Sequence, residues 1–167
     1  DTKRIRVLGV RRLDQRYDIA ALGLTTEELD DPIAFLDHID AKVAYQILPV
    51  LGGRSFPLAS DGWMYTHTGR EVAQLAGAAI RRELLAALGS DVTVVERATA
   101  RCRKLVTASV RHHEAQHGLD HDRNLRHPAA LSEATGTATK PFALRARMEL
   151  SAYLSQIASD VWLPQLV

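Results

Sequence analysis

Hydrophobic side chains recur at spacings of three and four residues in three long segments of the chain, and this period predicts three amphipathic helices. The first helix opens at residues 68–71 (Thr-Gly-Arg-Glu), which have the form of a capping box, and Gly89 ends it. The second runs from about Arg97 to about His117 or slightly beyond, and the third starts near Pro141. These helices account for most of the regular structure that the pattern predicts.

Shorter elements are predicted before the first long helix. Residues 4–10 alternate between polar and apolar side chains, which indicates a strand. Residues 25–28 (Thr-Thr-Glu-Glu) form another capping box and predict a short helical turn. Asp31 and Pro32 then suit an N-cap and a first helical position, so we expect a helix from here that Pro49 and the glycines at 52–53 end.

Three further segments complete the expected architecture. Residues 50–67 read as irregular or extended, and residues 132–140 as a loop rich in Thr, Ala and Gly. The run Val-Thr-Val-Val at 92–95 is β-branched and predicts a strand. Together these elements predict an α+β fold, mostly helical with a small sheet, and the length of 167 residues suits a single domain over 1–167.

Composition narrows the classes of function. Hydrophobic residues make up 46% and charged residues 25% of the chain, and the formal net charge is +1. This balance gives no electrostatic case for a nucleic-acid partner or an anionic membrane surface. No apolar run approaches the roughly 20 residues that a membrane span needs, so we expect none. The composition leaves the oligomeric state open.

The single cysteine and the first residue each bear on the setting of the protein. Cys102 alone excludes an intrachain disulfide framework and a cysteine-rich zinc module. It sits among apolar helix positions, so we expect a buried, inert thiol. The chain begins at Asp1 rather than Met and shows no signal peptide, so we expect that an upstream segment was removed, as in an exported or processed form or by cloning. The compartment stays open.

Histidines are concentrated in one place. Five of the seven lie between residues 112 and 127. The predicted buried stripe of the second long helix passes through Cys102, Val106 and Ser109, and its continuation reaches His113 and His117. Basic residues occupy the opposite face, where we expect a solvated surface.

His113 and His117 are four residues apart, which places both imidazoles on the same face of a helix, about 5–6 Å apart at Cβ. Two imidazoles in this arrangement can reach one tetrahedral Zn²⁺. Glu114, one position further round the helix, could take a proton from a zinc-bound water and later deliver it to a leaving group. The segment His113 to His117 is therefore a His-Glu-x-x-His motif.

With this motif the chain resembles the zincin superfamily of metallopeptidases over the motif helix, extending at most to the helix after it. The resemblance implies a zincin-like fold with an active-site helix, His113 and His117 as zinc ligands, Glu114 as general base, and a peptide or protein substrate. The metzincin-like pattern would need Gly and then His or Asp at the positions that Asp120 and Arg123 occupy, and so it fails.

The gluzincin-like pattern takes its third zinc ligand from a Glu on a later helix, and Glu149 on the last predicted helix fits that pattern. A carboxylate on a buried helix face is costly unless it is paired or metal-bound. A salt bridge to Arg145 or Arg147 is the bland alternative for Glu149. Glu133 and His121 remain open as other third ligands.

Two more residues could serve the same site. Asp120, one turn after His117 in an ending that looks like that of several gluzincin-like bacterial peptidases, could orient a ligand imidazole, or it could cap the helix or be solvated. Tyr153, one turn after Glu149, could donate its hydroxyl to a developing oxyanion, or it could be an ordinary aromatic core residue.

The expected function is therefore a zinc-dependent hydrolase, and above all a metallopeptidase. A non-catalytic metal-binding or helical interaction domain with a structural histidine site is the alternative from another class. Such a site would be closed by four protein ligands, whereas a catalytic site keeps a position for water. Sequence does not separate a peptide from another hydrolysable substrate.

Overall fold

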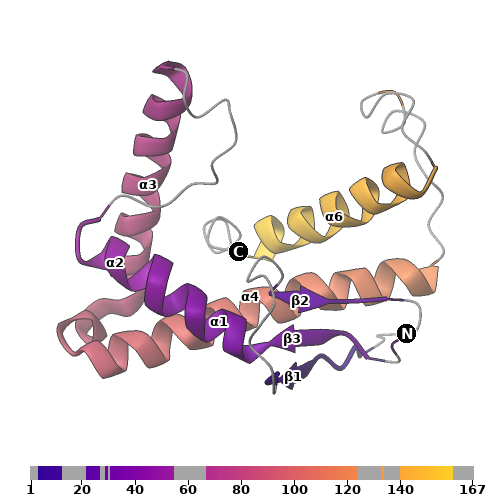
Figure 1. The fold of residues 1–167 in the computed structure, drawn as a ribbon, viewed down its shortest axis with the longest axis horizontal. Coiled ribbons are helices and arrows are strands. Elements are labelled where there is room, and N and C mark those ends of the chain that lie inside the picture. Colours follow the sequence, from indigo (N-terminus) through magenta and orange to yellow (C-terminus); the bar gives the residue numbers. More distant parts are fainter. Residues whose placement is uncertain are drawn as a thin grey trace.

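The computed structural model describes residues 4–12, 22–26, 29, 31–54, 67–123, 133 and 140–159. Helices dominate these segments, and a three-stranded sheet lies beside the longest of them (Figure 1). The predicted α+β, mostly helical class with a small sheet is confirmed. The predictions for residues 55–66 and for most of 132–140 lie outside the described residues.

The sheet has the order β1-β3-β2, with β1 at Leu8–Val10, β2 at Gly23–Leu24 and β3 at Ile33–Phe35. β1 pairs with β3 in parallel, and β2 pairs with β3 antiparallel, with Gly23 opposite Ala34. The strand predicted over residues 4–10 is therefore confirmed only at its end. The helix predicted from Pro32 is wrong for its first residues, because Ile33–Phe35 gains ladder partners on both sides, and these outweigh a local helical signal.

A continuous helical stretch follows β3. It consists of α1 (Leu36–Lys42), a π-helical segment η1 (Val43–Ile47) and α2 (Leu48–Leu51). The expectation that Pro49 ends the helix is wrong, because Pro49 lies in the first turn of α2, where no intrahelical N–H is required. The glycine signal is confirmed: Gly53 has φ of 91°, and its N–H donates to the Val50 carbonyl at 3.0 Å.

Three long helices form the rest: α3 (His67–Leu88), α4 (Val95–Arg123) and α6 (Lys140–Ser159). α3 starts at His67, one residue before the capping box from which it was predicted. α6 lies antiparallel along α4, since contacts pair Ser109 with Gln156 and His117 with Glu149 (Figure 1). None of the helices in the described segments is long and apolar enough to cross a membrane.

The strand predicted at residues 92–95 is wrong. Residues Gly89–Thr93 form a 3₁₀ segment, η3, and Val95 already belongs to α4. Gly89, with φ of 52°, ends α3 as predicted. The short link between α3 and α4 has no neighbouring strand in the described structure, and a β-branched run without a ladder partner gains nothing from an extended conformation.

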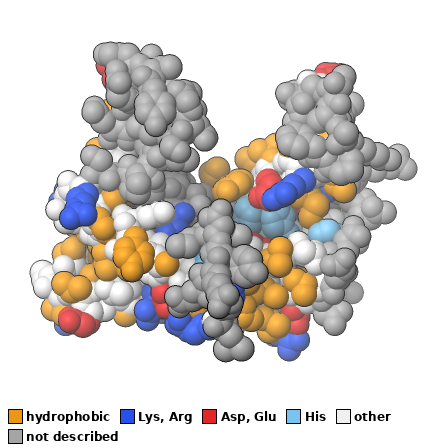
Figure 2. All heavy atoms as spheres, viewed as in Figure 1, with side chains coloured by type: hydrophobic (Ala, Val, Ile, Leu, Met, Phe, Trp, Pro, Cys, Tyr) orange, Lys and Arg blue, Asp and Glu red, His pale blue; other side chains and the backbone are white. Residues whose placement is uncertain are grey.

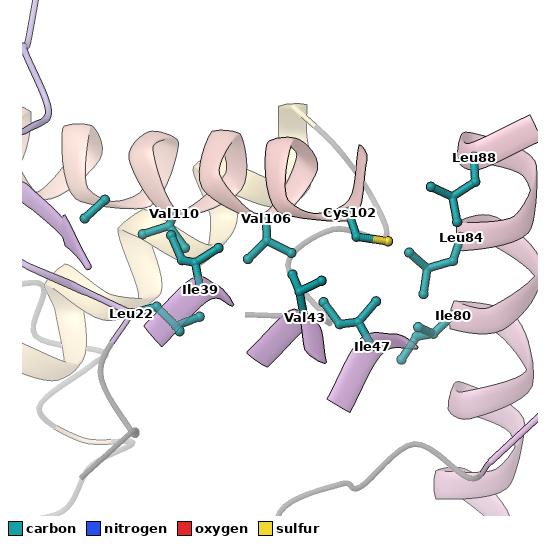
Figure 3. Packing of buried hydrophobic residues seen from close by; sticks show 11 residues of the cluster. Leu22, Ile39, Val43, Ile47, Ile80, Leu84, Leu88, Cys102, Val106 and Val110 are labelled. Carbon is teal, nitrogen blue, oxygen red and sulfur yellow. The ribbon is translucent and has the colours of Figure 1, made fainter. Parts of the chain in front are cut away.

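The hydrophobic core lies where the first half of α4 meets α1, η1 and α3 (Figure 3). Cys102, Val106 and Val110 on α4 face Ile39, Val43 and Ile47 on one side and Ile80, Leu84 and Leu88 on the other. The predicted stripe on this helix is thus confirmed, and so is the buried thiol, since Cys102 is only 1% exposed. This burial raises the pKa of Cys102 to about 11. Basic residues on the opposite face are exposed, as expected: Arg97, Arg101, Lys104 and Arg111.

Candidate metal centre

The buried stripe of α4 changes character after Val110. Its next members are His113, Glu114, His117 and Asp120, all buried, although the first half of the same stripe is mainly apolar. Burying a polar group is costly unless it is hydrogen-bonded, paired or metal-bound. The second half of α4 is therefore the place where partners for these side chains have to be found.

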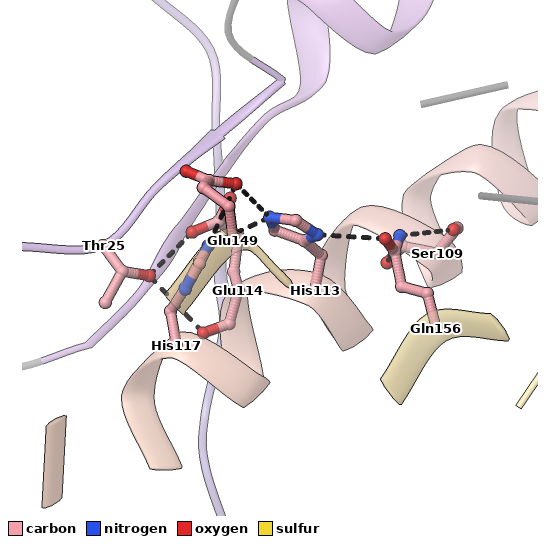
Figure 4. Close-up of polar contacts among 7 residues, drawn as sticks. All are labelled: Thr25, Ser109, His113, Glu114, His117, Glu149 and Gln156. Carbon is pink, nitrogen blue, oxygen red and sulfur yellow. Dashed lines mark hydrogen bonds and ion pairs between the residues drawn. The ribbon is translucent and has the colours of Figure 1, made fainter. Parts of the chain in front are cut away.

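Three ligand atoms converge beside α4 (Figure 4). The Nε2 atoms of His113 and His117 are 2.9 Å apart. Oε2 of Glu149, on α6, lies 3.4 Å from Nε2 of His113 and 3.8 Å from Nε2 of His117. A circle through three atoms with these separations has a radius of about 2.0 Å, which is close to the Zn–N and Zn–O bond lengths. The geometry therefore fits a single small metal ion.

One of the three candidates for the third ligand lies in this cluster with the two histidines. Among the described residues, the group able to hold a metal consists of His113, His117 and Glu149. His121 and Glu133 are described but do not belong to it. Within the same part of the chain, the ion-pair partners of Glu149 are the two histidines rather than Arg145 or Arg147.

Gln156 determines which nitrogen of His113 carries the proton. The Gln156 amide nitrogen donates to the Ser109 carbonyl at 3.1 Å and to the Ser109 hydroxyl oxygen at 2.9 Å. Its Oε1 therefore accepts, and it lies 2.9 Å from Nδ1 of His113. In a neutral ring the proton then sits on Nδ1, so the lone pair on Nε2 faces the cluster. This is the protonation that metal coordination requires.

The imidazole of His117 is also in the neutral form. Burial, with the nearby His113 acting in the same direction, lowers the pKa of His117 to about 4, against the opposing charges of Glu149 and Asp120. Its imidazole is therefore uncharged at neutral pH, and an uncharged imidazole is the form that binds a metal.

Asp120 is buried, so of the three roles considered for it, a solvated side chain is excluded. Its Oδ1 accepts from the Gln116 amide at 2.9 Å. Within the described residues, Nδ1 of His117 and Oδ2 of Asp120 have no hydrogen-bond partner. The direct hydrogen bond by which Asp120 could orient His117 is therefore absent here, and the influence of Asp120 on that imidazole is electrostatic.

The side chain of Glu114 contacts the segment that contains β2. Its Oε2 accepts a hydrogen bond from the Thr25 hydroxyl at 2.7 Å (Figure 4). Burial raises the pKa of Glu114, and the Thr25 hydrogen bond opposes that change. The Thr25 hydroxyl thus donates to a carboxylate 89 residues away. The capping box predicted at residues 25–28 lies partly outside the described residues.

Tyr153 lies at the edge of the cluster. Its ring meets that of His113 edge-on, with centroids 4.9 Å apart. The side chain is 41% exposed, so it is not an ordinary core aromatic residue. Burial of its hydroxyl, together with the charge of Glu149, raises the pKa of Tyr153. The phenol therefore stays protonated at neutral pH and can act as a hydrogen-bond donor.

The cluster is reached from solvent. In the space-filling view, histidine and acidic side chains are visible in a hollow of the surface, bordered by hydrophobic side chains (Figure 2). Glu149 is 41% exposed at its side chain, whereas the two histidine side chains are about 10% exposed. A site of this kind can admit a ligand while its nitrogen ligands stay held by the core.

Sequence reasoning missed Gln156 and Thr25. Gln156 could have been found, because it interrupts the inward face of the last helix seven residues after Glu149. No signal of that kind marks Thr25, whose role depends on where β2 lies against α4. Comparisons with models of protein families, with curated proteins and with solved structures give no match for this chain.

Proposed function

We propose that this protein is a zinc-dependent hydrolase, and specifically a metallopeptidase in which Glu114 is the general base. One observation carries the proposal: Nε2 of His113, Nε2 of His117 and Oε2 of Glu149 surround a point at bonding distance for zinc, and a carboxylate follows directly on the same helix. Two imidazoles and one carboxylate form a donor set that zinc takes in hydrolases. Three protein ligands also leave a position for water.

When bound, zinc would act as a Lewis acid that lowers the pKa of a water molecule and polarises a carbonyl group. Glu114 takes the proton of the attacking water and returns it to the leaving amine. The raised pKa of Glu114 suits this exchange, because a carboxylate that holds a proton more tightly is a better base. His113, whose Nδ1 faces the acceptor oxygen of Gln156, and His117 would each supply the lone pair of Nε2 to the metal.

Tyr153 is the second catalytic residue of the proposal. Its hydroxyl is protonated at neutral pH, and its ring stands against His113 at the edge of the cluster. A donor at this edge stabilises the negative charge that develops on a carbonyl oxygen during attack. The choice of a peptide or protein as substrate rests on the resemblance of residues 113–117 to the zincin motif.

The test is Glu114→Gln in the full chain loaded with zinc. We expect one zinc per chain in both proteins, and at least about a 1000-fold loss of turnover of a labelled denatured protein in the variant, because the amide cannot accept the water proton. Glu96→Gln is the matched control, since Glu96 is an exposed carboxylate on the same helix. Full hydrolytic activity in the Glu114 variant would refute the mechanism.

A structural metal site is the competing outcome. It would show as a fourth protein ligand in the zinc-loaded protein, together with no hydrolysis of any peptide in a mixed peptide library by the wild-type protein. The three-membered group in the described residues supports the catalytic assignment, because a closed structural site needs four protein ligands.

A further inference from the structure

The carboxylate of Glu114 is held from outside its own helix, by the segment that contains β2. We propose that Thr25 and Gly23 are positioning residues for Glu114: the Thr25 hydroxyl fixes one carboxylate oxygen, and the missing side chain of Gly23 leaves the space that the carboxylate occupies. This inference rests on the proposed function, because positioning matters only if Glu114 acts as a base.

The hydrogen bond from Thr25 is directed at the carboxylate. The Thr25 oxygen lies 2.7 Å from Oε2 of Glu114 but 3.4 Å from the Glu114 backbone carbonyl, so its single proton goes to the carboxylate. An O–H···O⁻ bond of this length is among the stronger kinds in proteins. Thr is also stiff at χ1, so the donor is itself well placed. The bond therefore limits rotation of the carboxylate.

Gly23 acts through space rather than through backbone freedom. A Cβ placed on Gly23 would lie 2.2 Å from Oε1 of Glu114, 2.5 Å from its Cδ and 2.6 Å from its Cγ. Real Cβ atoms essentially never approach other atoms that closely, and Gly23 does not have a positive φ. Any side chain at this position would push the Glu114 carboxylate away from where it now lies.

The two contacts together enclose Glu114 between β2 and α4. Oε2 meets the Thr25 hydroxyl, and Oε1 faces the Cα of Gly23, so both oxygens are located by residues of one short segment. His113, a ligand in the proposed site, is held in a similar way, because its ring contacts Gln156 on α6. His113 and Glu114 on α4 thus each have a partner from a different element, and the segment that contains β2 serves the base.

The kinetic test uses the zinc-loaded full chain and a peptide that the wild type cleaves. Thr25→Val should lower kcat by about 10- to 100-fold, the range expected for loss of a hydrogen bond to a charged group, with KM and zinc content unchanged. Thr25→Ser should restore kcat to within about 3-fold of wild type, because it keeps the hydroxyl. Thr99→Val is the matched control: its hydroxyl bonds a backbone carbonyl on the same helix, away from the site.

The space argument has its own variant. Gly23→Ala should lower kcat by at least about 100-fold with zinc still bound, because the added methyl displaces the base. Gly52→Ala is its control, since a Cβ there would meet only two carbonyl oxygens, at 3.4 and 3.8 Å. Wild-type kcat in either Gly23→Ala or Thr25→Val overturns the inference, and so does loss of zinc from Thr25→Val, which would make the role structural.

A readout without activity separates this inference from the proposed function. Thr25→Val should lower the Tm of the metal-free protein, but should leave the Tm unchanged when Glu114→Ala is already present, because the bond is then absent. Equal Tm losses in both backgrounds overturn the contact. If the wild type hydrolyses nothing, or if Glu114→Gln stays active, the proposed function fails, whereas the Tm comparison still decides whether Thr25 holds Glu114.

Discussion

The two halves of α4 present the same stripe to the interior and bury opposite kinds of side chain. In the first half, Cys102, Val106 and Val110 pack against apolar side chains of α1, η1 and α3. In the second half, His113 and His117 meet the carboxylate of Glu149 from α6. The stripe is continuous, so what distinguishes the halves is the polarity of the elements packed against them.

This difference shows how one helix can serve both stability and chemistry. Apolar burial in the first half fixes where α4 lies and how it is rotated, at roughly 25 cal/mol per Å² of buried apolar surface. Because α4 is a single helix, this packing also sets the orientation of the second half. The histidines there face inward although this half contributes little apolar area itself. Substitutions in the two halves should therefore have different effects. Those in the first half should lower stability, and those in the second half should weaken metal binding.

The strongest test of this separation is His117→Ala. We expect at least about a 1000-fold loss of zinc affinity, because two ligand atoms cannot hold the ion as three do. The metal-free variant should still fold, with a Tm lowered by the loss of the buried ring and of its contact with Nε2 of His113, since Nδ1 of His117 has no hydrogen bond to lose among the described residues. Competition with a chromophoric chelator measures the affinity. His121→Ala, one turn further on, is the control and should retain zinc.

Glu149→Ala sharpens the comparison by removing the proposed ligand on α6. The expected loss of zinc affinity is about 100-fold or more, because a charged oxygen ligand disappears while both imidazoles remain. Glu133→Ala removes an exposed carboxylate outside the cluster and should leave affinity unchanged. If the Glu133 variant lost zinc and the Glu149 variant kept it, the third ligand would have to be reassigned.

Gln156→Leu tests a residue that acts on the site through the orientation of His113. It leaves the Nδ1–H of His113 without its acceptor, so zinc affinity should fall by about 10- to 100-fold. The zinc affinity of the Glu114→Gln variant is the reference, because that change lies beside the site but removes none of the proposed ligands. Unchanged affinity in Gln156→Leu would mean that His113 is oriented without this hydrogen bond.

Val106→Ala is the corresponding change in the first half of α4. Removing two buried methyl groups should cost about 2 kcal/mol of unfolding free energy, measured by urea denaturation of the metal-free protein. The zinc affinity of the folded variant should match that of the wild type. A large loss of affinity with little loss of stability would contradict the division between the two halves.

The smallest effect is expected at Cys102, and it depends on pH. Cys102→Ala should cost about 1 kcal/mol at pH 7. Burial raises the pKa of the folded thiol from 9.0 to about 11, so the unfolded chain loses its proton first as pH rises. Wild-type stability therefore falls relative to the variant above pH 9, by about 1 kcal/mol at pH 10. Denaturation of both proteins at pH 7 and pH 10 checks this; a constant difference would argue against a buried thiol.

Local signals were reliable where one helix decides the outcome by itself. The period of apolar residues placed α4 and its buried stripe correctly, and the four-residue spacing placed His113 and His117 together. Predictions failed where a neighbour decides the outcome. Ile33–Phe35 became a strand because β1 and β2 flank it, and residues 92–95 did not become one because nothing in the described structure pairs with them.

The site divides along the same line. The resemblance to gluzincin-like peptidases pointed to Glu149 as the third ligand and left His121 and Glu133 open. The distances from Glu149 to the two histidines distinguish it from both. Gln156 carries a sequence signal, because a polar residue interrupts a buried helix face. The pattern at residues 25–28 concerns only the local backbone, and it does not indicate that the Thr25 hydroxyl donates to Glu114.

The sequence by itself determined the amphipathic helices, the buried thiol of Cys102 and the facing of two histidines and a glutamate along α4, because each depends only on helical geometry within one segment. Only the tertiary structure decided which residues complete the cluster. Glu149 and Gln156 reach α4 across the contact with α6, and Thr25 reaches Glu114 from 89 residues away. Such contacts depend on how separate elements pack, and no local period in the chain encodes that distance.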